Sequence, residues 1–309
     1  MKKTKEDWLK SSQYTWIYFI GFYLFTLVIV FVAYQSNKVT KQEALASAPS
    51  IAEQYQLGLM YQQGKMVEKN DKAALQWFTL AAKQGDAKAQ SALGSLYGNG
   101  KSKLIKRDYV QSAHWFGLAA NQGDADAQFG LGLLHYYGDG VPKDYDKAKH
   151  WYELSAAQNN AKAQANLGVL YALGQGVQKD EKMAAKWYQL ASDQGYANAQ
   201  TNLGGLYMLG KGVVKDTEKG IALYQMAAAQ NYPAAMFAIG VAYSKGAGVV
   251  KDQDKAAKWF TFAAKEGYAD AQRRLAAMYR DGVGVKKDLV ISEKWLEQAN
   301  LNSKATSSR

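Results

Sequence analysis

Cysteine is absent from the 309-residue chain, and histidine and proline occur only three times each. The absence of cysteine excludes disulfide scaffolds, thiolate zinc sites and cysteine nucleophiles, although it does not fix the redox compartment. Three prolines against 28 glycines favour helices separated by glycine turns. With 48% hydrophobic and 21% charged residues, the chain has the composition of a folded protein rather than a disordered one.

Charge is missing from one segment, residues 14–34. Its 21 residues match the roughly 20 that a helix needs to cross a bilayer. Tyr14, Trp16 and Tyr34 lie near its ends, where aromatic rings favour the membrane interface. A signal peptide has a shorter apolar region of about 7–15 residues. We therefore predict an uncleaved transmembrane signal anchor; the alternatives are a buried core helix and a signal peptide cut within 44–48.

Lysines flank this segment unequally. Four precede it and two follow it, and basic residues favour the cytoplasmic side. The predicted topology is a single pass through a bacterial inner membrane. Residues 1–13 would lie in the cytoplasm and residues 35–50 would form a short linker. The remainder of the chain would then lie in the periplasm.

The rest of the chain repeats one unit of 36 residues. Residues 161–196 match the next 36 in order, and one other copy carries a two-residue insertion within 101–107. Such a period overrides any domain count based on length. The predicted domain is a repeat array over 51–302 followed by a polar tail, 303–309. Its seven copies are 51–86, 87–124, 125–160, 161–196, 197–232, 233–268 and 269–302.

Each copy has the pattern of two helices. In its first half, apolar or small residues recur at copy positions 1, 3, 7, 8, 10 and 11, which is a helical stripe. Glycines two apart follow, such as Gly174 and Gly176, and indicate a turn. An aspartate such as Asp180 follows the turn, and we predict that it caps the second helix.

Two positions of this unit, which we call slots, hold the same kind of residue in nearly every copy. Six of the eight tryptophans occupy one slot of the second helix. We interpret them as core wedges between the helices of a copy; the alternative is a ligand-stacking ladder. The small slot is expected to let helices approach closely. It holds Gly58, Gly94, Gly132, Gly168, Gly204, Gly240 and Ala276.

The frame L-G-x-x-Y…G-x-G-V-x-K-D…W-Y-x-x-A-A-x-Q-G resembles the Sel-one-like repeat (SLR), a relative of the tetratricopeptide repeat (TPR). The resemblance implies an all-α, right-handed solenoid of antiparallel helix pairs that serves as an adaptor for protein assembly, and the family is common in bacterial envelopes. Met66 and Asn70 in the first copy and Leu296 in the seventh depart from the frame. Terminal copies of a solenoid are often atypical because they act as caps.

Enzyme chemistry finds little support in these residues. His114 and His150 occupy the same slot in adjacent copies, where other copies have lysine or glutamine, so this slot faces solvent. The G-x-G loops follow helices, whereas a dinucleotide loop follows a strand. No nucleophile elbow or metalloprotease motif is present. We predict no enzyme activity, no cofactor and no metal; an envelope enzyme or cell-wall-associated regulator is the less favoured alternative.

The net charge of +11 raises the question of nucleic acid. The excess is spread over the copies, and none has a concentrated basic face with interleaved aromatic residues, so no nucleic-acid partner is predicted. The densest basic run is 101–107. It is either a solvated loop or a contact for anionic lipid or an acidic partner.

The candidate protein-binding face is the set of first-helix positions that vary between copies. These positions form a helical stripe opposite the recurrent one, and in this chain the stripe is apolar and ends in arginines. The alternative is that some of these side chains pack between adjacent first helices. The resemblance to TPR proteins implies that first helices line the concave wall. The predicted residues are Phe129, Leu133, Tyr136, Tyr137, Asn166, Val169, Leu173, Asn202, Met208, Leu209, Phe237, Val241, Arg273, Arg274 and Arg280.

The sequence therefore predicts a non-enzymatic, membrane-anchored interaction scaffold of the bacterial envelope. It would bind a protein or peptide along this face, with residues 14–34 in the membrane. If the N-terminal segment is cleaved, the alternative is a secreted or host-directed effector of the same fold.

Overall fold

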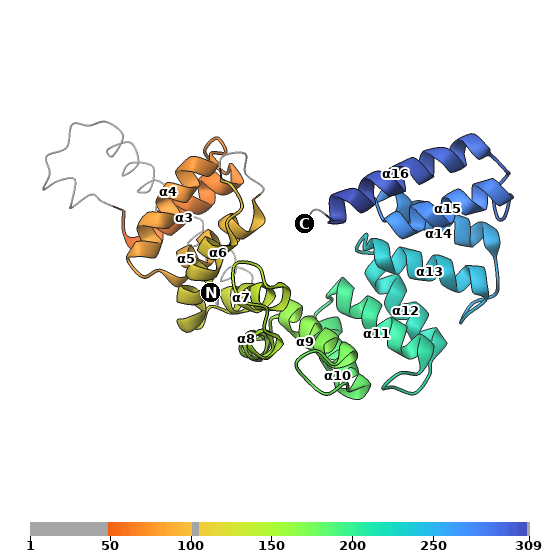
Figure 1. Ribbon diagram of the computed structural model, residues 1–309, viewed down its shortest axis with the longest axis horizontal. Helices are drawn as coiled ribbons and strands as arrows, with labels where there is room; N and C mark the ends of the chain where they lie inside the picture. Colours follow the sequence, from red (N-terminus) through yellow and green to blue (C-terminus); the bar gives the residue numbers. More distant parts are fainter. Residues whose placement is uncertain (1–48, 101–104, 308–309) are drawn as a thin grey trace, which may run out of the picture. The chain divides into compact units, whose positions relative to one another are not determined.

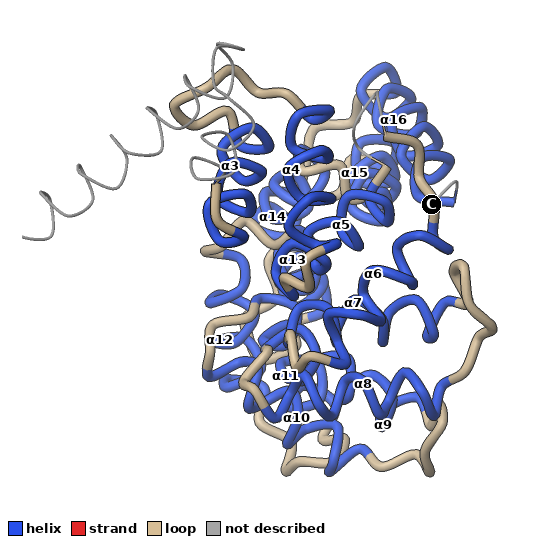
Figure 2. The backbone as a smooth tube through the Cα atoms, turned by 90° about the vertical axis from the view of Figure 1, so that its left-hand side faces the viewer, coloured by secondary structure: helices blue, strands red, loops and turns tan. Residues whose placement is uncertain are grey.

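The computed structural model describes residues 49–100 and 105–307, and these are helices joined by short loops (Figure 2). The predicted cytoplasmic segment 1–13, the anchor 14–34, almost all of the linker 35–50 and residues 101–104 of the basic run lie outside them. Within the described ranges, we find no helix with the length and hydropathy needed to span a membrane.

The chain divides into two compact units, an N-terminal unit of residues 1–127 and a C-terminal unit of residues 128–309. The N-terminal unit contains α3 (Ile51–Gln63), α4 (Asp71–Lys83), α5 (Ala87–Asn99) and α6 (Tyr109–Asn121). Helix α7 (Ala125–Tyr137) begins at the boundary. The C-terminal unit continues with α8 (Tyr145–Ala157), α9 (Ala161–Leu173), α10 (Glu181–Asp193), α11 (Ala197–Leu209), α12 (Thr217–Ala228), α13 (Pro233–Lys245), α14 (Gln253–Lys265), α15 (Ala269–Asp281) and α16 (Leu289–Ser307).

Odd-numbered helices are the first helices of the copies and even-numbered helices are the second. Within the C-terminal unit, second helices pack on their own first helix and on the first helix of the next copy, as in the series α10, α11, α12 and α13. The pairs of the C-terminal unit follow one another in chain order (Figure 1). This is the construction of an α-solenoid, in which each copy buries its apolar face against its neighbours.

Capping of the second helices confirms the role predicted for aspartate. Asp144, Asp180, Asp216 and Asp252 each precede a second helix and accept a hydrogen bond from a backbone N–H in its first turn, as Asp252 does from Lys255 at 2.9 Å. In the first copy Asn70 makes the equivalent bond. A cap satisfies N–H groups that have no partner inside the helix, so it fixes where each second helix begins.

The small slot receives an aromatic ring, as predicted for a close approach of helices. A Cβ atom on Gly168 would lie 2.5 Å from Cε1 of Tyr188, which is nearer than van der Waals contact allows. The same conflict would occur between Gly240 and Phe260. The small slot therefore needs glycine because an aromatic side chain of the second helix packs directly on the first helix. Equivalent glycine–aromatic pairs are Gly58–Phe78, Gly94–Phe116, Gly132–Tyr152 and Gly204–Tyr224.

The prediction that tryptophan is this core wedge is wrong in detail. The six tryptophans of the recurrent slot are only partly buried, and the aromatic residue that follows each of the first five is buried instead. Trp187 and Tyr188 show the difference: adjacent residues on a helix point about 100° apart, and Tyr188 is the one that meets the glycine. The tryptophans cover the edges of the core; Trp259 and Trp295, for example, pack beside its largest cluster.

In five of the seven copies, a pair of glutamines joins the end of the second helix to the first helix of the same copy. Gln164, in the first turn of α9, is buried; its Oε1 accepts a hydrogen bond from Gln194 Nε2 at 2.7 Å. Its own Nε2 donates to the carbonyl oxygen of Ala156, in the preceding copy. The sixth copy replaces both glutamines, with Met236 and Glu266. Equivalent pairs are Gln84–Gln54, Gln122–Gln90, Gln158–Gln128, Gln230–Gln200 and Asn302–Gln272.

Candidate protein-binding face

The residues predicted for the binding face all lie on first helices of the C-terminal unit, α7 to α15. The structure separates them into two groups by exposure. The exposed group is Tyr137, Leu173, Leu209, Arg273, Arg274 and Arg280. The partly buried group is Phe129, Leu133, Tyr136, Asn166, Val169, Asn202, Met208, Phe237 and Val241.

The partly buried apolar residues also contribute to the core. The Phe129 ring lies 6.0 Å from that of Tyr152, and the Phe237 ring lies 5.4 Å from that of Phe260. Leu133 packs against the cluster that contains Tyr152. The two ring contacts join each first helix to the second helix of its own copy, whereas the alternative interpretation placed these side chains between adjacent first helices. They can present only part of their surface to a partner.

Three exposed residues form a row, which we call the apolar row. Tyr137, Leu173 and Leu209 occupy the last position of α7, α9 and α11, and they are 64%, 59% and 66% exposed. In the next two copies the slot becomes charged, with Lys245 and Asp281. Single exposed apolar residues are ordinary, but the same exposed slot holds a large apolar residue in three consecutive copies.

Asn202 is held within the chain. Its Nδ2 donates to Oδ1 of Asn198 at 2.9 Å, and Nδ2 of Asn198 donates to the Tyr232 hydroxyl at 2.9 Å. A shallow hollow of about 400 Å³ lies beside this chain of bonds, and Tyr196 and Gln230 also line it. The sequence analysis missed Asn198 and Tyr232. Asn198 occupies one of the variable positions, so the same stripe could have indicated it.

Asn166, the equivalent of Asn202 in the preceding copy, lies against the core instead. Burial raises the pKa of the Tyr152 hydroxyl, and the Asn166 amide acts in the opposite direction. The Tyr152 hydroxyl is buried and has no hydrogen-bond partner in the described part of the chain, so the Asn166 amide lies near it without a hydrogen bond. The prediction that both asparagines grip a peptide backbone stays a prediction; the Asn202 amide already donates to Asn198.

The arginines at the end of the stripe are mostly paired. Arg273 bonds Asp270 at 2.6 Å, and Arg280 bonds Asp281 at 2.8 Å. The hydrogen bond between Arg280 and Asp281 raises the pKa of the arginine and lowers that of the aspartate. Exposed pairs of this kind contribute little to stability, and their charges stay accessible to a partner. Arg274 is exposed and makes no ion pair within the described residues.

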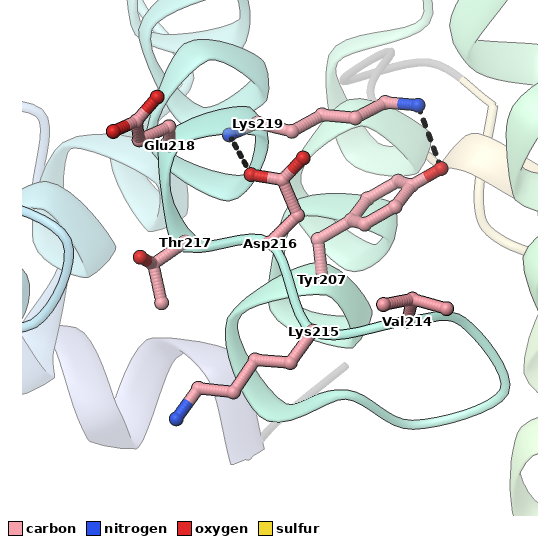
Figure 3. A pocket seen from close by; sticks show the side chains of 7 residues that line it. All are labelled: Tyr207, Val214, Lys215, Asp216, Thr217, Glu218 and Lys219. Atoms are coloured by element: carbon pink, nitrogen blue, oxygen red, sulfur yellow. Dashed lines mark hydrogen bonds between the residues drawn. The ribbon is translucent and has the colours of Figure 1, made fainter.

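A second hollow, of about 420 Å³, lies where the loop before α12 meets its first turn (Figure 3). The Lys219 ammonium lies 4.3 Å from the centre of the Tyr207 ring and donates to the Tyr207 hydroxyl at 2.7 Å. Asp216 caps α12 through the backbone N–H of Lys219. Figure 3 shows Lys215 and Lys219 pointing in opposite directions. Because the cations do not converge, this hollow is not arranged as an anion site.

Metal-binding geometry is not found in the part of the chain that the structure describes, where no three histidine, aspartate or glutamate side chains come together. His114 and His150 are exposed, as predicted for their slot, and each contacts the tryptophan beside it. His135 is buried, with Nδ1 3.4 Å from the carbonyl oxygen of Pro142. Its neighbours thus give it a structural role.

Solved structures with the same fold come from bacteria. A protective antigen of uropathogenic Escherichia coli with an SLR fold is 31% identical, with a TM-score of 0.66; the match covers 91% of this chain and 62% of that protein, so the present chain spans about three fifths of its length. A Sel1 repeat protein from Oxalobacter formigenes is 34% identical with a TM-score of 0.65, covering 84% of this chain and 76% of that one.

An immunity protein from Pseudomonas aeruginosa shares the fold at 20% identity and a TM-score of 0.52, with 70% of this chain and 81% of that one covered. No protein in the curated set matches the chain. The family model for the Sel1 repeat matches seven segments, 54–86, 87–124, 125–160, 161–196, 197–232, 233–268 and 269–302. The protein is therefore a member of the Sel1 repeat family.

Proposed function

We propose that this protein is a non-enzymatic, membrane-anchored scaffold of the bacterial envelope that binds a partner protein along the first helices of its C-terminal unit. Sel1 repeat proteins are generally protein-interaction scaffolds. The two hollows described above are open and shallow, and no three histidine, aspartate or glutamate side chains come together in the described residues.

The apolar row carries this proposal. Tyr137, Leu173 and Leu209 are more than half exposed at one slot in three consecutive copies, although an apolar side chain gains nothing from water. Equivalent side chains in adjacent copies are separated by about one helix spacing, roughly 8–10 Å, so the row is on the order of 20 Å long. A partner helix of about four turns, or an extended segment of about six residues, would cover it.

Removal of the row tests the proposal. Tyr137→Ser, Leu173→Ser and Leu209→Ser together should leave the fold intact, because all three side chains are exposed, and should weaken partner capture by at least tenfold. The matched control is Val214→Ser with Val250→Ser, which removes two more exposed apolar side chains from loops outside the row. Equal capture by the triple variant and its parent, from the same cells, would refute the proposed face.

The membrane anchor and the periplasmic location rest on the uncharged segment 14–34 and on the lysine asymmetry around it. A reporter that is active only in the cytoplasm, fused after Arg309, should be silent. Activity of that reporter would contradict the outward orientation. Mass spectrometry of the mature N-terminus distinguishes an uncleaved anchor from the alternative of a secreted effector, which would begin near residues 44–48.

A further inference from the structure

A second apolar row runs along the other side of the copies, on the second helices. Leu154 on α8, Leu190 on α10 and Met226 on α12 occupy one slot and are 39%, 49% and 52% exposed. On α12 the slots one turn before and one turn after Met226 are also apolar and exposed, with Ala222 and Ala229. Residues 220–232 include no charged side chain. An exposed helix face without charge has the composition of an interface core.

The charges beside Leu190 are arranged symmetrically. Lys186 lies three residues before Gln189, and Asp193 lies three residues after Leu190, so the two are equally far from the midpoint between Gln189 and Leu190. Both are exposed on the same helix face. Neither makes an ion pair within the described part of the chain. A two-fold axis through this midpoint would place two copies of α10 antiparallel, with each Lys186 beside Asp193 of the other copy.

We propose that the outer face of α8, α10 and α12 docks on the same face of a second copy of this chain. A two-fold axis that sets the two α10 helices antiparallel keeps the order of the helices, so each helix lies across from its own equivalent in the second copy. Leu154, Leu190 and Met226 then each meet their own equivalent, and Ala222 lies beside Ala229 of the second copy, where both leave room for close approach. The contacts among the residues named join apolar groups or opposite charges, as a self-complementary interface requires.

The dimer formed this way is weak. Three helices about 10 Å wide, in contact over roughly 15 Å of their length, bury on the order of 450 Å² per copy. The sum over both copies is about 900 Å², at the low end for specific complexes. Such contacts form transiently in dilute solution and become populated where copies are concentrated, as on a membrane surface. The second copy does not use the apolar row of the first helices, so this inference is independent of the proposed binding face and rests on the proposed membrane anchor only for the concentration of the copies.

Cysteine cross-linking of the full-length chain in its host membrane tests the dimer, because the natural chain has no cysteine to give a background. Leu190→Cys should form a disulfide-linked dimer under mild oxidation. Leu173→Cys, an equally accessible position on a first helix, should give at most one fifth as much. Equal dimer from the two variants would overturn the proposal, and so would none from Leu190→Cys.

Charge exchange identifies the two-fold axis. In the Leu190→Cys chain, Lys186→Glu replaces two attractive pairs by two repulsive ones and should lower the cross-linked fraction about tenfold. Asp193→Lys should do the same, and the combined exchange should restore dimer, which a change in folding alone would not do. Tyr137→Ser should leave cross-linking unchanged. Failure of the combined exchange to restore dimer, or masking of Leu190→Cys from a water-soluble maleimide without any dimer, would overturn the proposal in favour of another occupant.

Discussion

Gly168→Ala is the substitution that most sharply probes how the two helices of a copy meet. The new Cβ would lie 2.5 Å from Cε1 of Tyr188, a ring that is 4% exposed and has no free space to move into. Overpacking of this kind costs about 1–3 kcal/mol. Alanine regains up to about 1 kcal/mol over glycine through helix propensity. We therefore expect a net loss of about 1–2 kcal/mol in the stability of the α9–α10 pair.

A second substitution should reverse part of that loss. Tyr188→Leu alone leaves a cavity and should cost roughly 1–3 kcal/mol. Together with Gly168→Ala, the alanine methyl group occupies the space that the ring has left, so the two losses should not add. The expected coupling is about 1–2 kcal/mol in favour of the double variant. The seventh copy contains this combination, with Ala276 in the small slot and Leu296 in the aromatic slot.

Hydrogen exchange in the full-length chain measures these local stabilities, at the α9 and α10 amides for Gly168 and Tyr188 and at the α11 and α12 amides for the control at Gly205. Gly205→Ala is the matched control, because its Cβ would meet only the Tyr224 hydroxyl at 3.5 Å, an ordinary contact. That variant should be more stable than the parent by about 0.5–1 kcal/mol. A Gly168→Ala chain as stable as the Gly205→Ala chain, or a double variant with strictly additive losses, would refute the steric argument.

Three further predictions concern the caps, the buried glutamines and the first loop. The hydrogen bond from the Lys255 backbone N–H lowers the pKa of Asp252 in the folded chain. The stability that this carboxylate adds is therefore complete above its unfolded pKa near 4, and it is lost as the pH falls through the lower folded pKa. Asp252→Asn keeps the cap, as Asn70 does, so acid denaturation should show equal stability at neutral pH and a shallower decline below about pH 5. Gln164→Met should lower thermal stability by about 1 kcal/mol, because Gln194 and the Ala156 carbonyl lose a partner; an unchanged melting temperature would contradict this. Met66 has φ of +64°, a left-handed angle that strains a residue other than glycine, so Met66→Gly should stabilise the first copy by roughly 1 kcal/mol. Hydrogen exchange in α3 and α4 should slow accordingly; faster exchange would show that this angle carries no strain.

Much of the fold could be predicted because each copy restates the same local signals. The helical stripe, the paired glycines and the capping aspartate are short-range features, and they recur seven times with few departures. The loop glycines show why one departure is tolerated. In copies with a preceding repeat, a side chain on Gly212 would collide with the backbone of Glu181 at the start of the previous second helix. Met66 occupies the same loop position in the first copy, where no repeat precedes it.

The misplaced core residue has a physical reason. Trp187 and Tyr188 are adjacent, both large and both recurrent, so periodicity alone does not decide which one faces the neighbouring helix. The glycine that receives the ring decides it, and that contact spans 20 residues of chain. The glutamine pairs were missed for a similar reason, since the partners are 30 residues apart. Their joint replacement in the sixth copy, by Met236 and Glu266, was the available signal.

The binding face was predicted from first-helix positions that vary between copies and are apolar. In the structure, some of these side chains are exposed and others are partly buried. Phe129 and Phe237 are apolar because they support the aromatic rings behind them. Leu173 and Leu209 are apolar at helix ends that the fold leaves open. A sequence stripe cannot distinguish these two cases, because both satisfy the same helical spacing.

Photocross-linking from the centre of the apolar row tests the interaction scaffold most directly. A photoreactive residue in place of Leu173, in the full-length chain in living cells, should give one or a few discrete protein adducts. Tyr137→Ser with Leu209→Ser in the same chain should abolish them. The control is the same photoreactive residue in place of Met66, which is 63% exposed in the first copy and outside the row. Adducts from Leu173 that survive the two substitutions, or a pattern no different from that of the Met66 control, would contradict the account.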